Sequence, residues 1–275
     1  MGNGDGQRGS GDISGAGDTS GPDGPERAEE WRRLSRETWD ERAPWWDEVT
    51  AARATGDDFA DEVRATAEAL ALRPGGRVLD AGCGTGPFAI AFAGVGYRVD
   101  AVDLSAEMID RAGAHAARVG IEVAWRVADL ADLPYPNGTF DAVQARLSLH
   151  FAFDMPATLA ELSRVLRPTG RLYASVPGPL SPISANVWQR HLETVRRANN
   201  YVTPWELEAL LGHLGWEVIA HRPDLGATPD GSPPRFDPGA TRRLGLPRAL
   251  CQAASTTWAM VATHPDRPLG SPPAP

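Results

Sequence analysis

Apolar and polar positions alternate along the chain in blocks that predict strands and helices in turn. Short apolar runs typical of buried strands occupy residues 77–80, 97–105, 121–130, 140–149, 170–176, 216–221 and 256–264. Helical patterns lie between several of them, at residues 87–94, 106–120, 155–168 and 203–216. Strands that alternate with helices of this length predict βαβ units and an α/β fold with a parallel sheet.

The flanking segments have a different texture. Residues 1–25 are mostly Gly, Asp and Ser and are expected to form a disordered tail, as are residues 266–275. Residues 26–72 predict an N-terminal helical cap. The main domain then spans residues 73–265, with a substrate-side insertion at 177–201. A Pro/Gly/Arg-rich loop insertion at 222–248 is either lid-like or poorly ordered.

Composition narrows the class of protein. The net charge of −9 and the pI near 5.2 argue against a nucleic-acid partner. Two distant cysteines, Cys83 and Cys251, favour neither a disulfide framework nor a metal site. No apolar run is long enough for stable membrane insertion, so we expect a cytoplasmic protein. The oligomeric state is not predictable.

The stretch VLDAGCGTGPF, residues 78–88, is the first candidate for chemistry. It runs from a strand through Asp80 into a turn with Gly82, Gly84 and Gly86. Such a turn either binds a nucleotide at the carboxyl edge of a parallel sheet or only connects strand to helix tightly.

Three further residues bear on that choice. Asp103 ends the next strand, where a carboxylate can bind ribose hydroxyls or cap the following helix, although Ser105 alone could supply the cap. Asp129 follows the third strand, where it could accept from an adenine amine or only shape a turn. His150 ends the run RLSLHF, and both a general base and a structural part of the pocket wall are open roles.

Four ordered motifs resemble those of class I S-adenosylmethionine-dependent methyltransferases, in the branch of the ubiquinone, menaquinone and sterol enzymes. They are VLDAGCGTGPFAIAFA, VDAVDLSAEMIDRA, ADLADLPYPNGTFDAVQARLSLHF and LAELSRVLRPTGRLYASVPG, and they cover residues 77–176 strongly. The resemblance implies a Rossmann-like, doubly wound, mostly parallel seven-stranded sheet with an antiparallel last strand, capped by N-terminal helices. It also implies S-adenosylmethionine as cofactor and a small-molecule acceptor.

The resemblance assigns roles position by position. The implied cofactor residues are Asp80, Gly82, Cys83, Gly84, Asp103, Leu104, Met108, Asp129, Leu130 and Ala145. The implied acceptor side contains Arg146, with Trp188 and His191 as further wall candidates and His150 as the catalytic candidate. Trp39, Trp45 and Trp46 lie in the segment before the core that helps close the cofactor pocket in related enzymes, or they only pack the helix onto the sheet.

The function hypothesis is therefore methyl transfer to an O, N or C atom of a small molecule. Two alternatives remain: a non-catalytic protein that binds S-adenosylmethionine as a partner of an enzyme, and an NAD-dependent dehydrogenase. The latter would share the glycines and Asp103, but it would not be expected to show Asp80 directly before the glycines or NGTFDAV leading into RVLRPTG.

Overall fold

A computed structural model describes residues 24–54, 57–181, 184, 198–224, 247–253, 255 and 257–264 of the chain. Most of the two predicted tails, residues 225–246 of the predicted insertion at 222–248, and Trp188 and His191 lie outside these residues. Residues 222–224, predicted as part of that insertion, belong to the strand Glu217–Asp224, and Arg248 begins a helix. Gly24 and Pro25, predicted as part of the first tail, belong to the first helix.

The described residues form one seven-stranded sheet in the order β3-β2-β1-β4-β5-β7-β6. The strands are β1 (Arg77–Ala81), β2 (Arg98–Asp103), β3 (Ala124–Val127), β4 (Phe140–Arg146), β5 (Leu166–Pro177), β6 (Glu217–Asp224) and β7 (Thr257–Thr263). Pairs from β3 to β5 are parallel, while β7 runs antiparallel to both β5 and β6. The predicted Rossmann-like sheet with an antiparallel last strand is confirmed.

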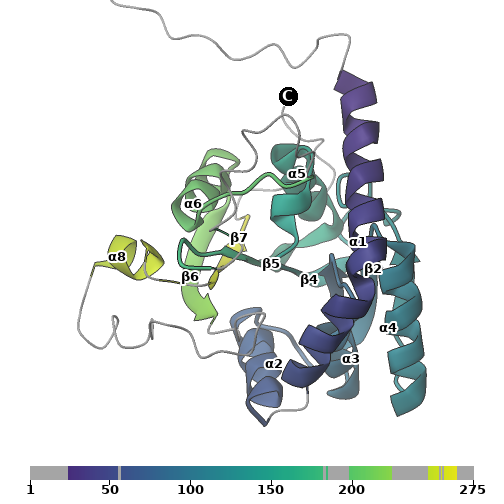
Figure 1. Cartoon of the computed structure of the whole chain (residues 1–275). Coiled ribbons are helices and arrows are strands. Elements are labelled where there is room, and N and C mark those ends of the chain that lie inside the picture. The colour runs from purple at the N-terminus through teal and green to yellow at the C-terminus, as the bar shows by residue number, and fades with distance from the viewer. Residues whose placement is uncertain are drawn as a thin grey trace, which may run out of the picture.

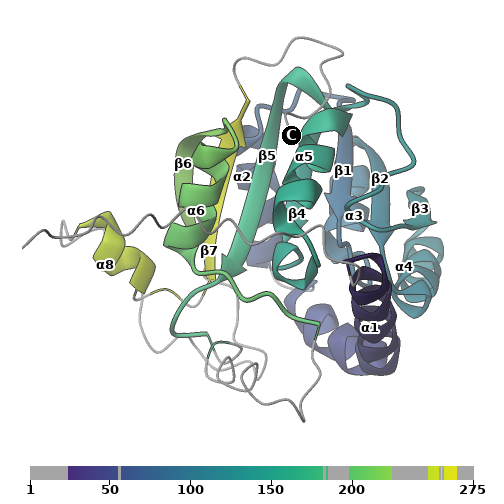
Figure 2. The same ribbon diagram turned by 90° about the horizontal axis from the view of Figure 1, so that it is seen from above.

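Helices cover both faces of this sheet (Figure 2). They are α1 (Gly24–Ala54), α2 (Asp57–Ala69), α3 (Pro87–Gly94), α4 (Ala106–Val119), α5 (Met155–Val165), α6 (Pro204–His213) and α8 (Arg248–Ala253), with a short 3₁₀ helix η1 (Leu149–Phe151). One core cluster joins the sheet to α5 and α6, and another joins it to α2, α3 and α4. Helix α1 lies along α4 beside the carboxyl end of the parallel strands (Figure 1).

Three predicted boundaries differ from the structure, each for a local reason. The strand predicted at 121–130 shrinks to β3, which pairs with β2 over four residues before the chain turns at Asp129. The helix predicted to reach Pro168 ends at Val165, because a residue before proline disfavours the helical conformation and Leu166 already pairs with Phe140 in the sheet. The strand predicted at 140–149 ends at Arg146, because Leu147 has a positive φ of 50°.

None of the described helices is long and apolar enough to cross a membrane.

Candidate active site

The glycine turn after β1 uses its three glycines for different purposes. Gly82 has φ +78°, and a Cβ there would lie 2.3 Å from Ser148 Cβ. Gly84 has φ +54°, and a Cβ there would lie 2.8 Å from Trp46 Nε1. Gly86 lacks room for a Cβ because the Trp125 ring packs there, so this third glycine serves packing and the start of α3. Only Gly82 and Gly84 line the cleft described below.

Asp103 ends β2 directly opposite this turn. Its Oδ2 accepts a hydrogen bond from the Gly84 N–H at 2.9 Å, and its Oδ1 accepts from the Ser105 N–H at 3.0 Å. Burial raises the pKa of this carboxyl above its ordinary value. Two backbone donors therefore orient the carboxylate, which retains lone pairs for a ligand.

The cap of α4 is a separate residue. Ser105 Oγ accepts from the Met108 N–H at 3.1 Å and donates to Asp40 Oδ1 of α1 at 2.5 Å. Since Ser105 caps the helix, Asp103 is not needed for that purpose.

The loop after β3 brings Asp129 to the same edge of the sheet. Asp129 Oδ1 accepts from the Ala131 N–H at 3.0 Å, and Oδ2 accepts from Arg32 Nε of α1 at 2.6 Å.

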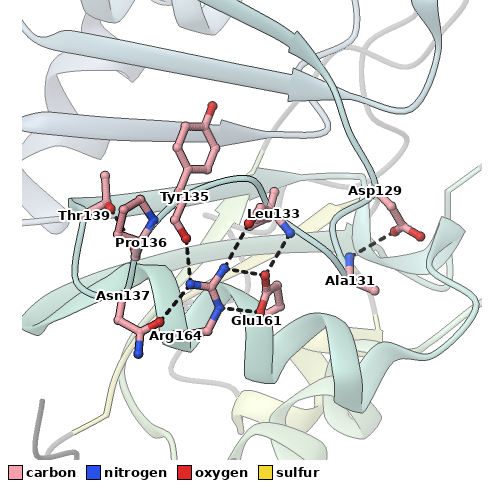
Figure 3. A network of polar contacts seen from close by, with 9 residues as sticks. All are labelled: Asp129, Ala131, Leu133, Tyr135, Pro136, Asn137, Thr139, Glu161 and Arg164. Atoms are coloured by element: carbon pink, nitrogen blue, oxygen red, sulfur yellow. Dashed lines mark hydrogen bonds and ion pairs between the residues drawn. The ribbon is translucent and has the colours of Figure 1, made fainter. Parts of the chain in front are cut away.

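Arg164 of α5 holds the rest of this loop (Figure 3). Its guanidinium donates to the carbonyl oxygens of Leu133 at 3.0 Å and Tyr135 at 2.6 Å. It also binds both carboxylate oxygens of Glu161, one of which accepts from the Leu133 N–H at 2.8 Å. Because the loop is attached to α5 in this way, the position of Asp129 does not depend on the loop alone.

The turn after β4 forms another part of the cleft wall, next to the glycine turn. Leu147 adopts the left-handed conformation, which is uncommon for a residue with a side chain. Ser148 Oγ then donates to the Ala81 carbonyl oxygen at 2.8 Å, and its Cβ fills the space left by Gly82.

His150, in η1, is fully buried and lines the cleft. Neither Nδ1 nor Nε2 has a hydrogen-bond partner among the residues that the structure describes. Burial lowers the pKa of His150 to about 3, so the ring is neutral at pH 7. The ring packs on Phe151 with centroids 4.1 Å apart. A buried polar ring without partners at the wall of a cleft points to a ligand that completes its hydrogen bonds.

Helix α1 closes the cleft with aromatic side chains. The Trp39 ring meets Phe151 edge-on, with centroids 5.0 Å apart, and meets Trp46 at 5.8 Å. Trp31 Nε1 donates to the Phe151 carbonyl oxygen at 2.8 Å, and Thr50 Oγ1 lies 3.0 Å from Thr85 Oγ1. These contacts fasten α1 at both ends of the cleft.

Together these elements border a cleft of about 880 Å³ of empty space, a volume that includes open solvent at its mouth. The lining residues come from α1, the turns after β1, β2, β3 and β4, and η1. They are Ser35, Trp39, Trp46, Gly82, Gly84, Asp103, Leu104, Met108, Asp129, Leu130, Arg146, Leu147, Ser148, His150, Phe151 and Ala152. No three His, Cys, Asp or Glu side chains of the described residues are grouped so as to hold a metal ion.

Comparisons with known proteins decide the family. Residues 79–174 match the model of a methyltransferase domain. A ubiquinone biosynthesis O-methyltransferase of Xanthomonas axonopodis pv. citri is 30% identical over 183 residues, which cover 63% of this chain and 76% of that protein. The chain belongs to the class I S-adenosylmethionine-dependent methyltransferase family.

Two other similarities set the scope of that membership. The nocamycin O-methyltransferase of Saccharothrix syringae is 37% identical over 190 residues, 66% of this chain and 63% of that protein. The matched part of the chain spans less than two thirds of the length of this relative and of several other curated relatives. The crystal structure of the [4+2]-cyclase SpnF has a TM-score of 0.63 at 21% identity and covers 85% of this chain and 97% of its own, which shows a shared fold.

Most of the residues expected from the methyltransferase resemblance lie in the cleft. The structure brings together Gly82, Gly84, Asp103, Leu104, Met108, Asp129, Leu130, Arg146 and His150. Asp80, Cys83 and Ala145 are buried beside the cleft without lining it. Burial raises the pKa of Asp80 to about 6 and raises the pKa of the Cys83 thiol, which fits Cys83 as a packed filler.

Arg146 lines the cleft, but its guanidinium is bound to other parts of this methyltransferase domain. The Nη1 atom of Arg146 donates to Glu62 Oε1, and its Nη2 atom donates to Thr66 Oγ1, both at 2.7 Å. The guanidinium also stacks on the ring of Phe88, 4.0 Å from the ring centroid. Its side chain is only 8% exposed. These contacts tie α2 to the sheet and favour a structural task over the acceptor contact predicted from sequence.

Sequence reasoning missed five lining residues: Ser35, Leu147, Ser148, Phe151 and Ala152. A usable signal existed for four of them, because they follow β4 as the glycine turn follows β1, and adjacent parallel strands end at the same edge. Ser35 is different. It lies on a helix whose placement over the cleft depends on tertiary contacts.

Proposed function

We propose that this protein transfers a methyl group from S-adenosylmethionine to a small-molecule acceptor. The observation that carries the proposal is one cleft that joins the glycine turn, Asp103 and Asp129 to His150, a buried histidine whose ring has no hydrogen-bond partner among the described residues. The names of the relatives, a ubiquinone biosynthesis and a nocamycin O-methyltransferase, favour oxygen as the acceptor atom.

The residues present fit this cofactor. Gly82 and Gly84 line the cleft and allow Ser148 and Trp46 to pack closely against this turn, beside which the amino-acid portion would lie. The carboxylate of Asp103 is held at the end of β2, where it can accept from ribose hydroxyls. Leu104, Met108 and Leu130 supply apolar contacts for a nucleobase, with Asp129 at its edge. When bound, S-adenosylmethionine supplies a methyl group on a positively charged sulfur that a nucleophile displaces.

The chain's own contribution is chiefly positioning. Trp39, Trp46 and Phe151 surround the cleft with ring faces and edges, which exclude water and attract a cation. Holding donor and acceptor in line supplies up to about 7–11 kcal/mol in the best intramolecular cases. A strong acid is not required, because the leaving sulfur is already activated.

His150 is the group placed to orient the acceptor hydroxyl. Its imidazole is neutral and its two nitrogens have no hydrogen-bond partner among the described residues, so one of them could accept a hydrogen bond from that hydroxyl and polarise it. The other nitrogen would carry the proton of the neutral ring.

The test measures binding and turnover separately. Calorimetry should detect binding of S-adenosylmethionine and of S-adenosylhomocysteine. Transfer of labelled methyl groups should appear as mass shifts of acceptors in a panel of phenols, quinones and amines. His150→Gln should lower kcat by about 10²-fold with cofactor affinity kept. If calorimetry detects binding of neither S-adenosylmethionine nor S-adenosylhomocysteine, the proposal is overturned.

The SpnF cyclase likeness shows that this fold does not by itself determine the reaction. Tight cofactor binding without transfer to any member of the panel would therefore favour a non-catalytic or non-transferring role. Binding of NADH in place of S-adenosylmethionine would favour a dehydrogenase.

A further inference from the structure

An ion pair links α1 to the loop that carries Asp129. Arg32 Nε donates to Asp129 Oδ2 at 2.6 Å across 97 positions of the chain. The other carboxylate oxygen accepts from the Ala131 N–H at 3.0 Å. Asp129 lines the cleft and Arg32 does not, so the guanidinium approaches the carboxylate from outside. The two donors together fix the plane of the carboxylate.

The turn of α1 that carries Arg32 is itself fixed in place. The neighbouring Trp31 donates its indole N–H to the Phe151 carbonyl oxygen at 2.8 Å. One turn later Ser35 lines the cleft, 4% exposed, and its buried Oγ has no hydrogen-bond partner in the described part of the chain. This part of α1 therefore borders the ligand space and presents a polar atom that a ligand would satisfy.

The carboxylate of Asp129 is not saturated by its two donors. A carboxylate has about four lone-pair positions, so two remain after Arg32 and Ala131 are counted. It accepts hydrogen bonds and donates none, which favours a ligand amine over a ligand carbonyl at this point.

We propose that Arg32 is a positioning residue, which holds Asp129 in the orientation that selects a nucleobase with an exocyclic amine. This inference rests on the proposed function, since the cofactor proposed there carries adenine. Arg32 acts through Asp129 and does not touch the ligand. It makes α1 part of the device that recognises the base.

An ion pair this exposed contributes little to folding, because the side chains of Arg32 and Asp129 are 36% and 29% exposed. Removing Arg32 should therefore change ligand selection with almost no change in melting temperature. This separates a positioning role from a structural one.

The experiment compares two probes that differ at the base. S-Adenosylhomocysteine carries the amine, and S-inosylhomocysteine carries an oxo group in its place. We expect calorimetry on the wild type to show at least about tenfold tighter binding of the adenosyl compound, the size expected for one hydrogen bond to a charged group. In Arg32→Gln this ratio should fall to about twofold, chiefly through weaker binding of the adenosyl compound.

Arg33→Gln is the matched control. Arg33 is the next residue of the same helix and pairs with Glu37 one turn away, with its side chain 53% exposed. This variant loses the same charge from α1 and should keep the wild-type ratio and affinities. Asp129→Asn is the second variant and should lose the ratio as Arg32→Gln does.

The outcomes separate the two proposals. If the wild type binds neither compound, the proposed function fails. If the wild type discriminates between them and Arg32→Gln discriminates equally, the inference fails and the proposed function stands. If Asp129→Asn still discriminates between the two compounds, the inference also fails. It fails as well if Arg32→Gln loses affinity equally for both compounds and has a lowered melting temperature.

Discussion

The two sides of the cleft differ in how their polar groups are satisfied. On the side of the β1 and β2 turns, the Asp103 carboxylate already accepts from Gly84 and Ser105. On the side of η1, the side chain of His150 is buried and has no hydrogen-bond partner among the described residues. The first side is preorganised by the protein's own backbone. The second is incomplete and gains its hydrogen bonds only with a ligand, which favours it as the acceptor side.

The largest expected effect comes from filling the space at Gly82. Gly82→Ala introduces a Cβ 2.3 Å from Ser148 Cβ at a φ of +78°, so both a clash and backbone strain follow. We expect a loss of about 3 kcal/mol in unfolding free energy and loss of detectable cofactor binding. Urea denaturation and calorimetry measure the two effects.

Gly96→Ala is its control. Gly96 has a φ of +96°, and a Cβ there would have no other atom within 4 Å, so only the strain of about 1 kcal/mol should appear, with binding kept. Equal losses in the two variants would show that the close approach of Ser148 to Gly82 is unimportant.

The next prediction compares two aspartates of β2, Asp103 and Asp100, to separate an effect on ligand binding from an effect on folding. Asp103→Asn keeps the shape of the side chain but replaces one acceptor oxygen with an NH₂ donor. That donor would face the backbone N–H group of Gly84 or Ser105, which is also a donor. We expect about 100-fold weaker binding of S-adenosylhomocysteine, which corresponds to about 2.7 kcal/mol.

Asp100→Asn provides the converse. Asp100 is buried on the same strand and pairs with Arg77 at 2.8 Å, away from the cleft. This change should lower the unfolding free energy and leave binding intact. The interpretation of Asp103 would be contradicted if the two variants lost affinity equally.

The same contrast explains what the sequence could predict. The cofactor side follows from contiguous motifs, in which a strand, a turn and a helix lie within a few residues of Gly82 or Asp103. Their common edge follows from parallel strand order. The seven-stranded sheet was predictable because each strand has its own apolar run.

The part of the site to which α1 contributes depends on pairs far apart in the chain. The contact of Trp39 with Phe151, and that of Arg32 with Asp129, arise only when α1 lies over the sheet edge. Nothing in the local pattern around Arg32 distinguishes it from Arg33, which points to solvent-exposed Glu37. The contact of Arg146 with Glu62 was not predictable for the same reason, because Glu62 belongs to the N-terminal cap.

A third prediction concerns acid stability. Because burial lowers the pKa of His150 to about 3 from 6.5, the unfolded state binds a proton below pH 6.5 that the folded state does not. The stability that depends on neutral His150 is complete above pH 6.5 and is lost as the pH falls toward 3. At pH 5 the loss is about 2 kcal/mol. Asp80, with its pKa raised to about 6, acts in the opposite direction, since its folded form gains a proton first.

His150→Gln should remove this acid sensitivity. Denaturation at pH 7 and at pH 5 should show a smaller difference for this variant than for the wild type, by about 2 kcal/mol. His213→Gln, at the exposed end of α6, is the control and should keep the wild-type difference. An unchanged pH dependence in His150→Gln would mean that the ring is not buried in neutral form.

The smallest effect tests the aromatic wall on the acceptor side. Trp39→Leu removes the edge-on contacts with Phe151 and Trp46 but keeps an apolar side chain. Since an aromatic pair contributes about 1 kcal/mol beyond its buried area, KM for the acceptor should rise about fivefold. The dissociation constant of S-adenosylhomocysteine should stay within about twofold, because Asp103 and the glycine turn are untouched. Trp45→Leu, at a ring that is 45% exposed and does not line the cleft, should change neither value. If Trp39→Leu weakened cofactor binding as much as acceptor binding, Trp39 would not belong to the acceptor side alone, and the division of the cleft into two differently prepared sides would be wrong at this residue.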